Sequence, residues 1–295
     1  MKVAILGTGN IGTDILIKVL RSNYLKCEYF VGKNPDSIGL NTAKKLGVQV
    51  SANGLDFLLE HHRDFDLVFD ATSASAHYKN YEALKKLNKK IINLTPAKIG
   101  EFCIPVLNIE QVLHANNINM VTCGGQASIP IIYSMAKGQK GIEYVEVVSS
   151  LSSKSAGMAT RENIDEYLST TEKAIKLFSG CISSKAILNI NPALPEVNMK
   201  TTIRAIIKNH NFSLIEQQVQ LMVEMVQKYV PGYEIVIPPY VENDRVTTMI
   251  QVIGAGDFLP AYAGNLDIIT SAAVTTAELI AEYTHEHKHY RYNFA

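Results

Sequence analysis

One cysteine of this chain stands where a nucleophilic thiolate forms most easily. Residues 119–127, NMVTCGGQA, place Cys123 between the end of an apolar strand and the start of a helix. A helix N-terminus has unpaired backbone N–H groups and the positive end of the helix dipole, which together lower a thiol pKa from its reference of about 8.5. Gly124 and Gly125 let a ligand approach the backbone closely. We therefore predict that Cys123 is a nucleophile; the alternative is a small buried hydrophobe in a tight turn.

A glycine-rich turn at the start of the chain suggests a second kind of chemistry. Apolar residues 2–6 predict a strand, residues 7–12 read GTGNIG, and residues 14–20 have apolar positions at helical spacing. A strand, a glycine turn and a helix in this order form the fingerprint of dinucleotide binding. Gly7 allows the tight turn, Gly9 lets a pyrophosphate approach the backbone, and Gly12 lets the helix pack on the strand. The alternative is an ordinary strand-to-helix turn.

The residues after the next strand leave the choice of dinucleotide open. A strand over residues 28–31 is followed by GKNPD, where an acidic side chain normally binds the adenosine ribose of NAD. Asn34 lies nearest the strand end and Asp36 slightly beyond. Asn34 can hydrogen-bond a ribose, whereas Lys33 can meet the 2′-phosphate of NADP. We expect NAD, with NADP as the alternative.

The first 123 residues alternate between strands and helices, as in a doubly wound parallel sheet of the Rossmann type. The further strands are expected over residues 48–50, 65–70, 90–94 and 118–122, and the helices over residues 37–46 and 55–62. Ligands of such sheets bind beyond the carboxyl ends of the strands. The loop at residues 71–76, rich in small side chains, is therefore expected to line the cofactor cleft.

After the cysteine the pattern changes to an α+β arrangement. Helices are expected over residues 128–137, 161–178 and 213–229, and strands over residues 144–149, 186–190, 201–207, 233–237 and 246–253. This order suggests a mixed sheet with helices on one face, whose other face is available for dimerisation. A last helix over residues 266–283 is expected to pack back on the first domain. We thus expect an α/β protein with an NAD-binding domain at 1–123 and about 262–295, and a catalytic and dimerisation domain at 124–261.

Composition excludes several classes of function. The chain has 28 Lys+Arg and 28 Asp+Glu without a basic stripe, so we expect no nucleic-acid partner. It has no secretory signal and no window of about 20 apolar residues, so we expect no membrane span. The four cysteines are far apart without a CxxC pair, which argues against a zinc site or a disulfide framework and favours a reduced cytoplasmic compartment.

Histidines offer weaker candidates. The segment HEHKH at residues 285–289 suggests a metal site, but in a terminal helix its side chains fall on different faces, and we predict no metal. His77 follows the small-residue loop and either caps the next helix or lies near the cofactor.

Six segments resemble the acetylating, CoA-dependent acetaldehyde dehydrogenases, a family often paired with a 4-hydroxy-2-oxovalerate aldolase. They span nearly the whole chain: residues 7–14 (GTGNIGTD), 68–77 (VFDATSASAH), 94–97 (LTPA), 119–127, 152–161 (SSKSAG with TR at 160–161) and 259–268 (LPAYAGNLDI). The resemblance implies a fold like that of the semialdehyde dehydrogenases. It also implies that acetaldehyde, CoA and NAD give acetyl-CoA and NADH, as in aromatic hydrocarbon catabolism.

The resemblance assigns roles to particular residues. Cys123 would be the acyl-thioester nucleophile, which agrees with the need for a thiolate to add to the carbonyl before hydride can leave. Asn265 would reach the nicotinamide end. The pyrophosphate would be held by Thr8, Gly9, Asn10 and Ile11, and a second cofactor-contacting loop would comprise Ser153, Lys154, Ser155, Ala156, Gly157, Met158, Ala159, Thr160 and Arg161.

Three departures from the family pattern bear on activity. An acidic residue that the family carries after a basic one is replaced by Thr201, following Lys200, and a threonine cannot act as a carboxylate base. Met158 and Ala159 replace a usual Pro-Gly, and the hairpin near Val246 is shorter by a loop.

These departures keep two other functions open. One is a catalytically impaired NAD-binding partner subunit of an aldolase. The other is a phosphorylating semialdehyde dehydrogenase, which uses arginines near the thiol; Arg161 and Arg204 are the candidates. For the assembly we expect a homodimer through the second domain or a hetero-oligomer with an aldolase.

Overall fold

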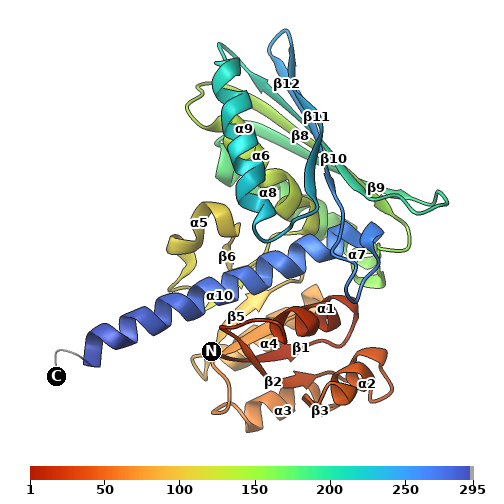
Figure 1. The fold of residues 1–295 in the computed structure, drawn as a ribbon, viewed down its shortest axis with the longest axis vertical. Coiled ribbons are helices and arrows are strands. Elements are labelled where there is room, and N and C mark those ends of the chain that lie inside the picture. Colours follow the sequence, from red (N-terminus) through yellow and green to blue (C-terminus); the bar gives the residue numbers. More distant parts are fainter. Residues whose placement is uncertain (293–295) are drawn as a thin grey trace. The chain divides into compact units, whose positions relative to one another are not determined.

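The structure, a computed structural model, describes residues 1–292 apart from the side chains of residues 158–159 and 286–292 (Figure 1). The chain divides into two compact units. Unit 1 is Met1–Met120 with the chain from Thr270 onward, and unit 2 is Val121–Ile269. The boundaries fall just before the cysteine segment and within the last helix.

Unit 1 is built on a seven-stranded sheet in the order β3-β2-β1-β4-β5-β7-β6, with every neighbouring pair parallel. Its strands are β1 (Lys2–Leu6), β2 (Lys26–Val31), β3 (Gln49–Ser51), β4 (Leu67–Asp70), β5 (Lys90–Asn93), β6 (Glu101–Phe102) and β7 (Asn117–Asn119). The central strands are buried on both faces, as expected for a parallel sheet between two helical layers. The predicted Rossmann-like sheet is therefore confirmed.

The helices of unit 1 join successive strands. They are α1 (Asn10–Val19), α2 (Ile38–Lys45), α3 (Gly54–Glu60), α4 (Ala74–Lys85) and α5 (Pro105–Val112). The sequence analysis missed β6 and α5. A strand of two residues has no readable alternation, and α5 is interrupted by a non-helical Asn108, so neither produces a regular hydrophobic period.

The strand order of unit 1 reverses between β1 and β4, and the loops that follow these two strands touch there. A Cβ atom added to Gly7, whose φ is +116°, would lie 2.5 Å from the Ala71 carbonyl oxygen. The helix α10 (Gly264–Tyr292) contacts this unit through residues between Thr270 and Glu278: the Thr270 hydroxyl donates to Asp14, and the Ser22 hydroxyl donates to Glu278.

Unit 2 is built on a five-stranded mixed sheet in the order β11-β12-β10-β8-β9. The strands are β8 (Ile142–Ser152), β9 (Ser183–Asn191), β10 (Met199–Ile207), β11 (Tyr233–Glu242) and β12 (Arg245–Val252). β8 and β9 are parallel, whereas the other pairs are antiparallel. The predicted mixed sheet is confirmed, and four of its strands, β8, β9, β10 and β11, are longer than the sequence pattern indicated.

Three helices of unit 2 cover one face of this sheet: α6 (Cys123–Ala136), α8 (Ile164–Ser179) and α9 (Phe212–Gln227) (Figure 1). On the other face, Lys200 and Arg204 of β10 are exposed. The helix predicted over residues 161–178 is in fact two, α7 (Met158–Glu162) and α8, because Asn163 has non-helical backbone angles. The 3-10 turn η1 (Ala261–Ala263) leads into α10.

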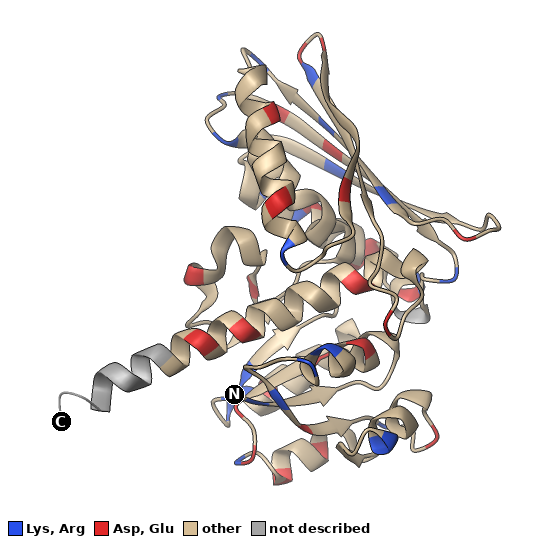
Figure 2. Ribbon diagram, viewed as in Figure 1, with Lys and Arg blue, Asp and Glu red and all other residues tan. Residues whose placement is uncertain are grey.

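Charged residues of both signs are interspersed along the described part of the chain (Figure 2). Direct pairs, such as Arg204 with Glu146 at 2.8 Å, lie opposite each other on neighbouring strands. None of the helices in the described residues combines the length and apolar character required to cross a membrane.

The close approach of α1 to its preceding loop generates a stability prediction. A Cβ atom on Gly12 would lie 1.8 Å from the Gly7 carbonyl oxygen, which is fixed backbone. We expect Gly12→Ala to lower the free energy of unfolding by about 3 kcal/mol, as overpacking of a rigid contact does. Gly9→Ala is the matched control, because nothing lies within 4 Å of its added Cβ atom. Chemical denaturation of both variants checks this; equal midpoints would contradict it.

Candidate active site

Cys123 is the first residue of α6, five residues earlier than the sequence pattern placed the start of this helix. The Thr122 side chain accepts the Gly125 N–H at 2.9 Å and so caps the helix directly before the cysteine. Gly124 and Gly125, which are poor helix formers, thus lie in the first turn of the helix. β7 also ends earlier than predicted, at Asn119, because Val121 has a φ of +61°. That conformation is costly for a β-branched residue, and such strain is typical of functional turns.

The Cys123 sulfur lies against a tyrosine hydroxyl at the helix start. The Sγ atom donates to the Tyr167 hydroxyl oxygen at 3.5 Å, and the Gly124 N–H donates to the same oxygen at 2.8 Å. The cysteine is 7% exposed. The tyrosine hydroxyl therefore stands between the helix N-terminus and the reactive atom.

The expectation of a lowered thiol pKa is wrong for the free protein. Burial raises the Cys123 pKa above its ordinary value, while the Tyr167 hydroxyl and the backbone N–H groups of Gly124 and Cys123 act in the lowering direction. The helix terminus acts as predicted, but the loss of water around a buried thiolate outweighs it. The sequence could place the cysteine at a helix start but could not show how deeply it is buried.

Tyr167 belongs to a polar network that the sequence analysis missed. The Thr171 hydroxyl donates to the Tyr167 carbonyl oxygen at 2.8 Å, and the Thr122 and Thr171 hydroxyls are 2.7 Å apart. Tyr167, Thr170 and Thr171 are all buried on α8. The available signal was this group of polar residues three and four apart on the apolar face of a helix.

Thr201, which stands in place of an acidic residue, lies close to the same helix start. It is fully buried, and its hydroxyl is 3.1 Å from that of Ser149. The Ser149 hydroxyl oxygen is in turn 3.2 Å from the position of a Cβ atom on Gly124. The sheet thus presents neutral hydroxyl groups, Ser149 and Thr201, to the start of α6.

The glycine loop and the small-residue loop of unit 1 come together around a hollow of about 600 Å³. It lies at the carboxyl ends of β1, β2 and β4, where ligands of open parallel sheets bind. The residues that line it are Leu6, Gly7, Thr8, Gly32, Lys33, Asn53, Leu55, Asp56, Thr72, Ser73, Ser75, Ala76, Lys79 and Asn80. Asn53, Asp56 and Lys79 were not predicted to line it. They lie at the start of α3 and on α4, and the sequence does not show which faces of these helices turn toward the sheet edge.

A buried network holds the wall of this hollow in place. The Asp70 carboxylate accepts hydrogen bonds from the Thr72 backbone N–H and hydroxyl, and from the Asn80 amide. His77 Nδ1 lies 2.9 Å from the same carboxylate, and Asn117 Nδ2 lies 3.1 Å from His77 Nε2. His77 is therefore a fully buried part of the scaffold. It neither caps α4, whose cap is Ser73, nor lines the hollow, so neither of its two predicted roles is confirmed.

Of the residues considered for the ribose, only Lys33 lines the hollow. The Asn34 side-chain carbonyl accepts the Asp36 N–H at 3.0 Å, which forms a local turn. Asp56, in the first turn of α3, supplies a carboxylate to the hollow instead.

The predicted second cofactor loop is brought together with Asn265 within unit 2. Arg161 holds the loop closed: its Nε donates to the Ala156 carbonyl and its Nη2 to the Ser153 carbonyl, both at 2.9 Å. Asn265 Nδ2 donates to the Ser155 carbonyl at 3.3 Å, while its Oδ1 is buried without a hydrogen-bond partner among the residues that the structure describes. Lys154 forms an exposed ion pair with Glu196.

Two sets of predicted positions lie outside the described side chains. Met158 and Ala159 are the first residues of α7, and only their backbone is described. His287 and His289 belong to the part of α10 whose side chains are not described. Among the residues that are described, no group of three or more His, Cys, Asp or Glu side chains is arranged to hold a metal ion.

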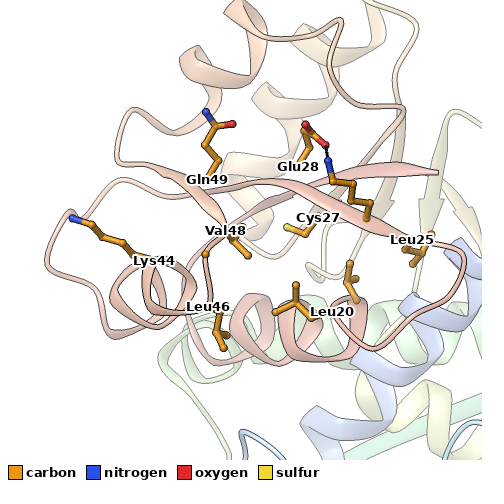
Figure 3. A pocket seen from close by; sticks show the side chains of 11 residues that line it. Leu20, Leu25, Cys27, Glu28, Lys44, Leu46, Val48 and Gln49 are labelled. Atoms are coloured by element: carbon orange, nitrogen blue, oxygen red, sulfur yellow. Dashed lines mark hydrogen bonds and ion pairs between the residues drawn. The ribbon is translucent and has the colours of Figure 1, made fainter.

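A further hollow of about 730 Å³ lies at the amino ends of β2 and β3 (Figure 3). It is lined by the ends of α1 and α2, and Lys26 and Glu28 pair beside it at 3.0 Å. Burial raises the pKa of Cys27 in this hollow to about 12, so its thiol is a poor nucleophile. Ligands of open parallel sheets bind at the opposite edge, and we do not assign this hollow to the active site.

Comparison with known proteins places this geometry in a family. Residues 123–260 match the family model described as prokaryotic acetaldehyde dehydrogenase, dimerisation. An acetaldehyde dehydrogenase of Pectobacterium atrosepticum is 50% identical over 283 residues, 95% of this chain and 96% of that protein. The acetaldehyde dehydrogenase of Spirochaeta aurantia is 48% identical over 97% of this chain and 96% of its own length. That of Carboxydothermus hydrogenoformans is 45% identical over 96% of this chain and 94% of its own length.

The raised pKa of Cys123 predicts how stability depends on pH. The folded thiol ionises at higher pH than the unfolded one, so its stabilising contribution is complete below about pH 8.5 and is lost as pH rises through the folded pKa. We expect the free energy of unfolding to fall above that pH, with at most about 1.4 kcal/mol per pH unit from this group. Cys123→Ala should lose less stability over the same range. Chemical denaturation at several pH values measures this, and identical pH dependence of both proteins would contradict it.

Proposed function

Because this chain belongs to the family of prokaryotic acetaldehyde dehydrogenases, we propose that it oxidises acetaldehyde, or a similarly short aldehyde, and delivers the acyl group to CoA. The observation that carries the proposal is the position of the Cys123 sulfur, at the start of α6 and against a tyrosine hydroxyl. Gly124 and Gly125 leave little side-chain volume beside it, which suits a small substrate.

The chemistry of an aldehyde explains why a cysteine is required. A carbonyl hydrogen leaves as hydride only from a tetrahedral adduct, so a nucleophile must first add to the carbonyl carbon. The Cys123 sulfur forms that bond. The Gly124 and Gly125 N–H groups donate to the Tyr167 and Thr122 hydroxyls, so negative charge on the oxygen is stabilised by the positive end of the α6 dipole. NAD, when bound, supplies the hydride acceptor. Cys123 then carries the acyl group as a thioester. The CoA thiol attacks the carbonyl of this thioester and displaces the Cys123 sulfur, which leaves as the thiolate.

The residues of unit 1 fit a dinucleotide. The hollow of about 600 Å³ begins at the Gly7–Thr8 turn, and nothing lies within 4 Å of a Cβ position on Gly9, so backbone N–H groups there are open to a pyrophosphate. In unit 2 the buried Asn265 Oδ1 is an acceptor that lacks a donor, which suits the carboxamide N–H of a nicotinamide. We assign the hollow of unit 1 to NAD. For Asn265 and the loop at 153–161 in unit 2, a contact with the cofactor is what the family resemblance implies.

Phosphate is disfavoured as the acyl acceptor, because the two candidate arginines are engaged elsewhere. Arg161 donates to carbonyl groups of its own loop, and Arg204 pairs with Glu146 on the exposed face of the sheet. An anion site built from these side chains would first have to break those bonds.

The assembly follows from the second unit. Its sheet has helices on one face, and the segment 123–260 matches a dimerisation module, which supports an oligomer. We propose a homodimer formed through this unit, with an aldolase as a possible second partner by family resemblance. The four cysteines are free thiols, which fits a cytoplasmic setting.

The activity is tested by NADH absorbance with acetaldehyde or propionaldehyde, in the presence of CoA or phosphate. We expect turnover with CoA and none with phosphate, and a loss of about a thousandfold or more in Cys123→Ala, because the nucleophile is gone. Cys181→Ala is the matched control: it removes another buried free thiol of unit 2 and should keep its activity. Full turnover by Cys123→Ala would refute the mechanism. If turnover is absent while NAD still binds, the alternative is favoured in which the chain is a catalytically impaired partner subunit of an aldolase. Thr201, in place of an acidic residue, is the observation that motivates this alternative.

The choice of dinucleotide is tested at the hollow of unit 1. Asp56 can accept hydrogen bonds from ribose hydroxyls, whereas Lys33 is an exposed cation that favours a 2′-phosphate. We expect NAD to be preferred, and Lys33→Ala to raise KM for NADP by about two- to fivefold while leaving KM for NAD unchanged. Lys45→Ala, at the exposed end of α2 and outside the hollow, is the control. An equal effect of Lys33→Ala on both dinucleotides would contradict this assignment.

A further inference from the structure

The Tyr167 hydroxyl is the side-chain group in contact with the Cys123 sulfur, and the activity proposed above gives it no role. It is brought there by α8, 44 residues along the chain from the cysteine. Its oxygen accepts the Gly124 N–H at 2.8 Å and lies 3.5 Å from Sγ, and the tyrosine is 6% exposed. A polar group of this size is costly to bury beside a thiol unless its hydrogen bonds are satisfied there.

Hydrogen-bond accounting shows which proton is available to the sulfur. The Thr171 hydroxyl donates to the Tyr167 carbonyl, so the short contact between Thr122 and Thr171 uses the Thr122 proton. The Thr122 oxygen already accepts the Gly125 N–H. The Thr122 hydroxyl is also within hydrogen-bond reach of the Tyr167 phenol. Because the Thr122 proton points to Thr171, the Thr122 oxygen can accept the phenolic proton, which turns to the sulfur once the thiol proton has left to water.

The position of the hydroxyl makes it a strong donor to a thiolate. The Gly124 N–H, at the positive end of the α6 dipole, polarises the phenolic O–H, so that a chain runs from N–H through O–H to sulfur. A hydrogen bond to an ionised acceptor is about twice as strong as one between neutral groups. The hydroxyl thereby extends the reach of the helix terminus to the reactive atom.

The other elements packed against α6 offer the sulfur no charged partner. Burial, Tyr167 and the backbone N–H groups of Gly124 and Cys123 account for the displaced thiol pKa, and no ionised side chain of α8, α9, β8 or β10 contributes to it in the described part of the chain. The groups that β8 and β10 turn toward this helix start are the neutral hydroxyls of Ser149 and Thr201.

We propose that Tyr167 is a catalytic residue that holds the Cys123 sulfur in the thiol state and donates its O–H to the thiolate, in place of a carboxylate base. This rests on the proposed function, in which Cys123 is the nucleophile. In the thiol state the S–H donates to the phenol; on ionisation the S–H proton goes to water and the phenolic O–H turns to the sulfur. No covalent bond other than S–H changes.

The test is the pH dependence of Cys123 alkylation by iodoacetamide, measured by mass spectrometry of the peptide that contains it. We expect Tyr167→Phe to move the midpoint of the alkylation rate upward by about one pH unit or more. Changed access to the sulfur alters the plateau rate and not the midpoint. Tyr233→Phe is the matched control, because it removes a buried phenol that donates to the Ala127 carbonyl of the same helix at 2.6 Å without touching Cys123. Its midpoint should equal that of the natural protein.

A second variant keeps the test decisive if Tyr167→Phe does not fold, as judged by circular dichroism. A Cβ atom on Gly124 would lie 2.3 Å from the Tyr167 hydroxyl oxygen, so Gly124→Ala displaces the phenol and should also raise the midpoint. An unmoved or lowered midpoint in the folded variant overturns the proposal. Alkylation requires no substrate, so a raised midpoint without aldehyde turnover would reject the proposed function and leave the sulfur–phenol pairing intact.

Discussion

The start of helix α6 is the structural feature on which the chemistry of this protein depends. Thr122 caps the helix, Cys123 opens it, and the strained backbone of Val121 turns the chain into it. Two opposing effects act on the sulfur there. The helix N-terminus favours a thiolate, whereas burial favours the neutral thiol, and burial prevails in the free protein. Burial therefore disfavours ionisation of the proposed nucleophile, and a hydroxyl group lies beside its sulfur.

The same physical principle organises the first unit. Its loops follow the carboxyl ends of parallel strands and converge where the strand order reverses. The close approach of Gly7 and Ala71 is possible because glycine has no Cβ atom, and the buried Asp70 carboxylate fixes the adjoining loop through several hydrogen bonds. The proposed phosphate-binding role of this loop requires rigid backbone N–H groups, and this scaffold holds the loop in place.

The departure at Thr201 is more informative with the structure than without it. A threonine in place of an acidic residue suggested weakened activity, since it cannot serve as a base. The structure places its hydroxyl beside Ser149, close to Gly124, and places Tyr167 directly on the sulfur. The environment of the thiol is therefore built from neutral hydroxyl groups. In the proposed role, the Tyr167 hydroxyl donates a hydrogen bond to the thiolate, whereas an acidic residue at position 201 would have accepted the thiol proton.

The sequence by itself determined what local patterns encode. Gly7, Gly9 and Gly12 at their spacing predicted the nucleotide loop, and the segment around Cys123 predicted the nucleophile. Short apolar segments between helical ones predicted the strands of both sheets. These signals are local because a turn, a strand and a helix start each depend on a few consecutive residues.

Only the tertiary structure decided which distant residues meet. The contact between Tyr167 and Cys123, the carboxylate of Asp56 in the nucleotide hollow and the burial that reverses the thiol pKa all depend on packing between separate elements. Packing of this kind leaves no fixed spacing in the chain, because the register of one helix against another is set by side chains along the whole interface. The prediction of Cys123 as the nucleophile therefore came from local sequence, whereas the burial of its sulfur and its contact with Tyr167 are set by the fold.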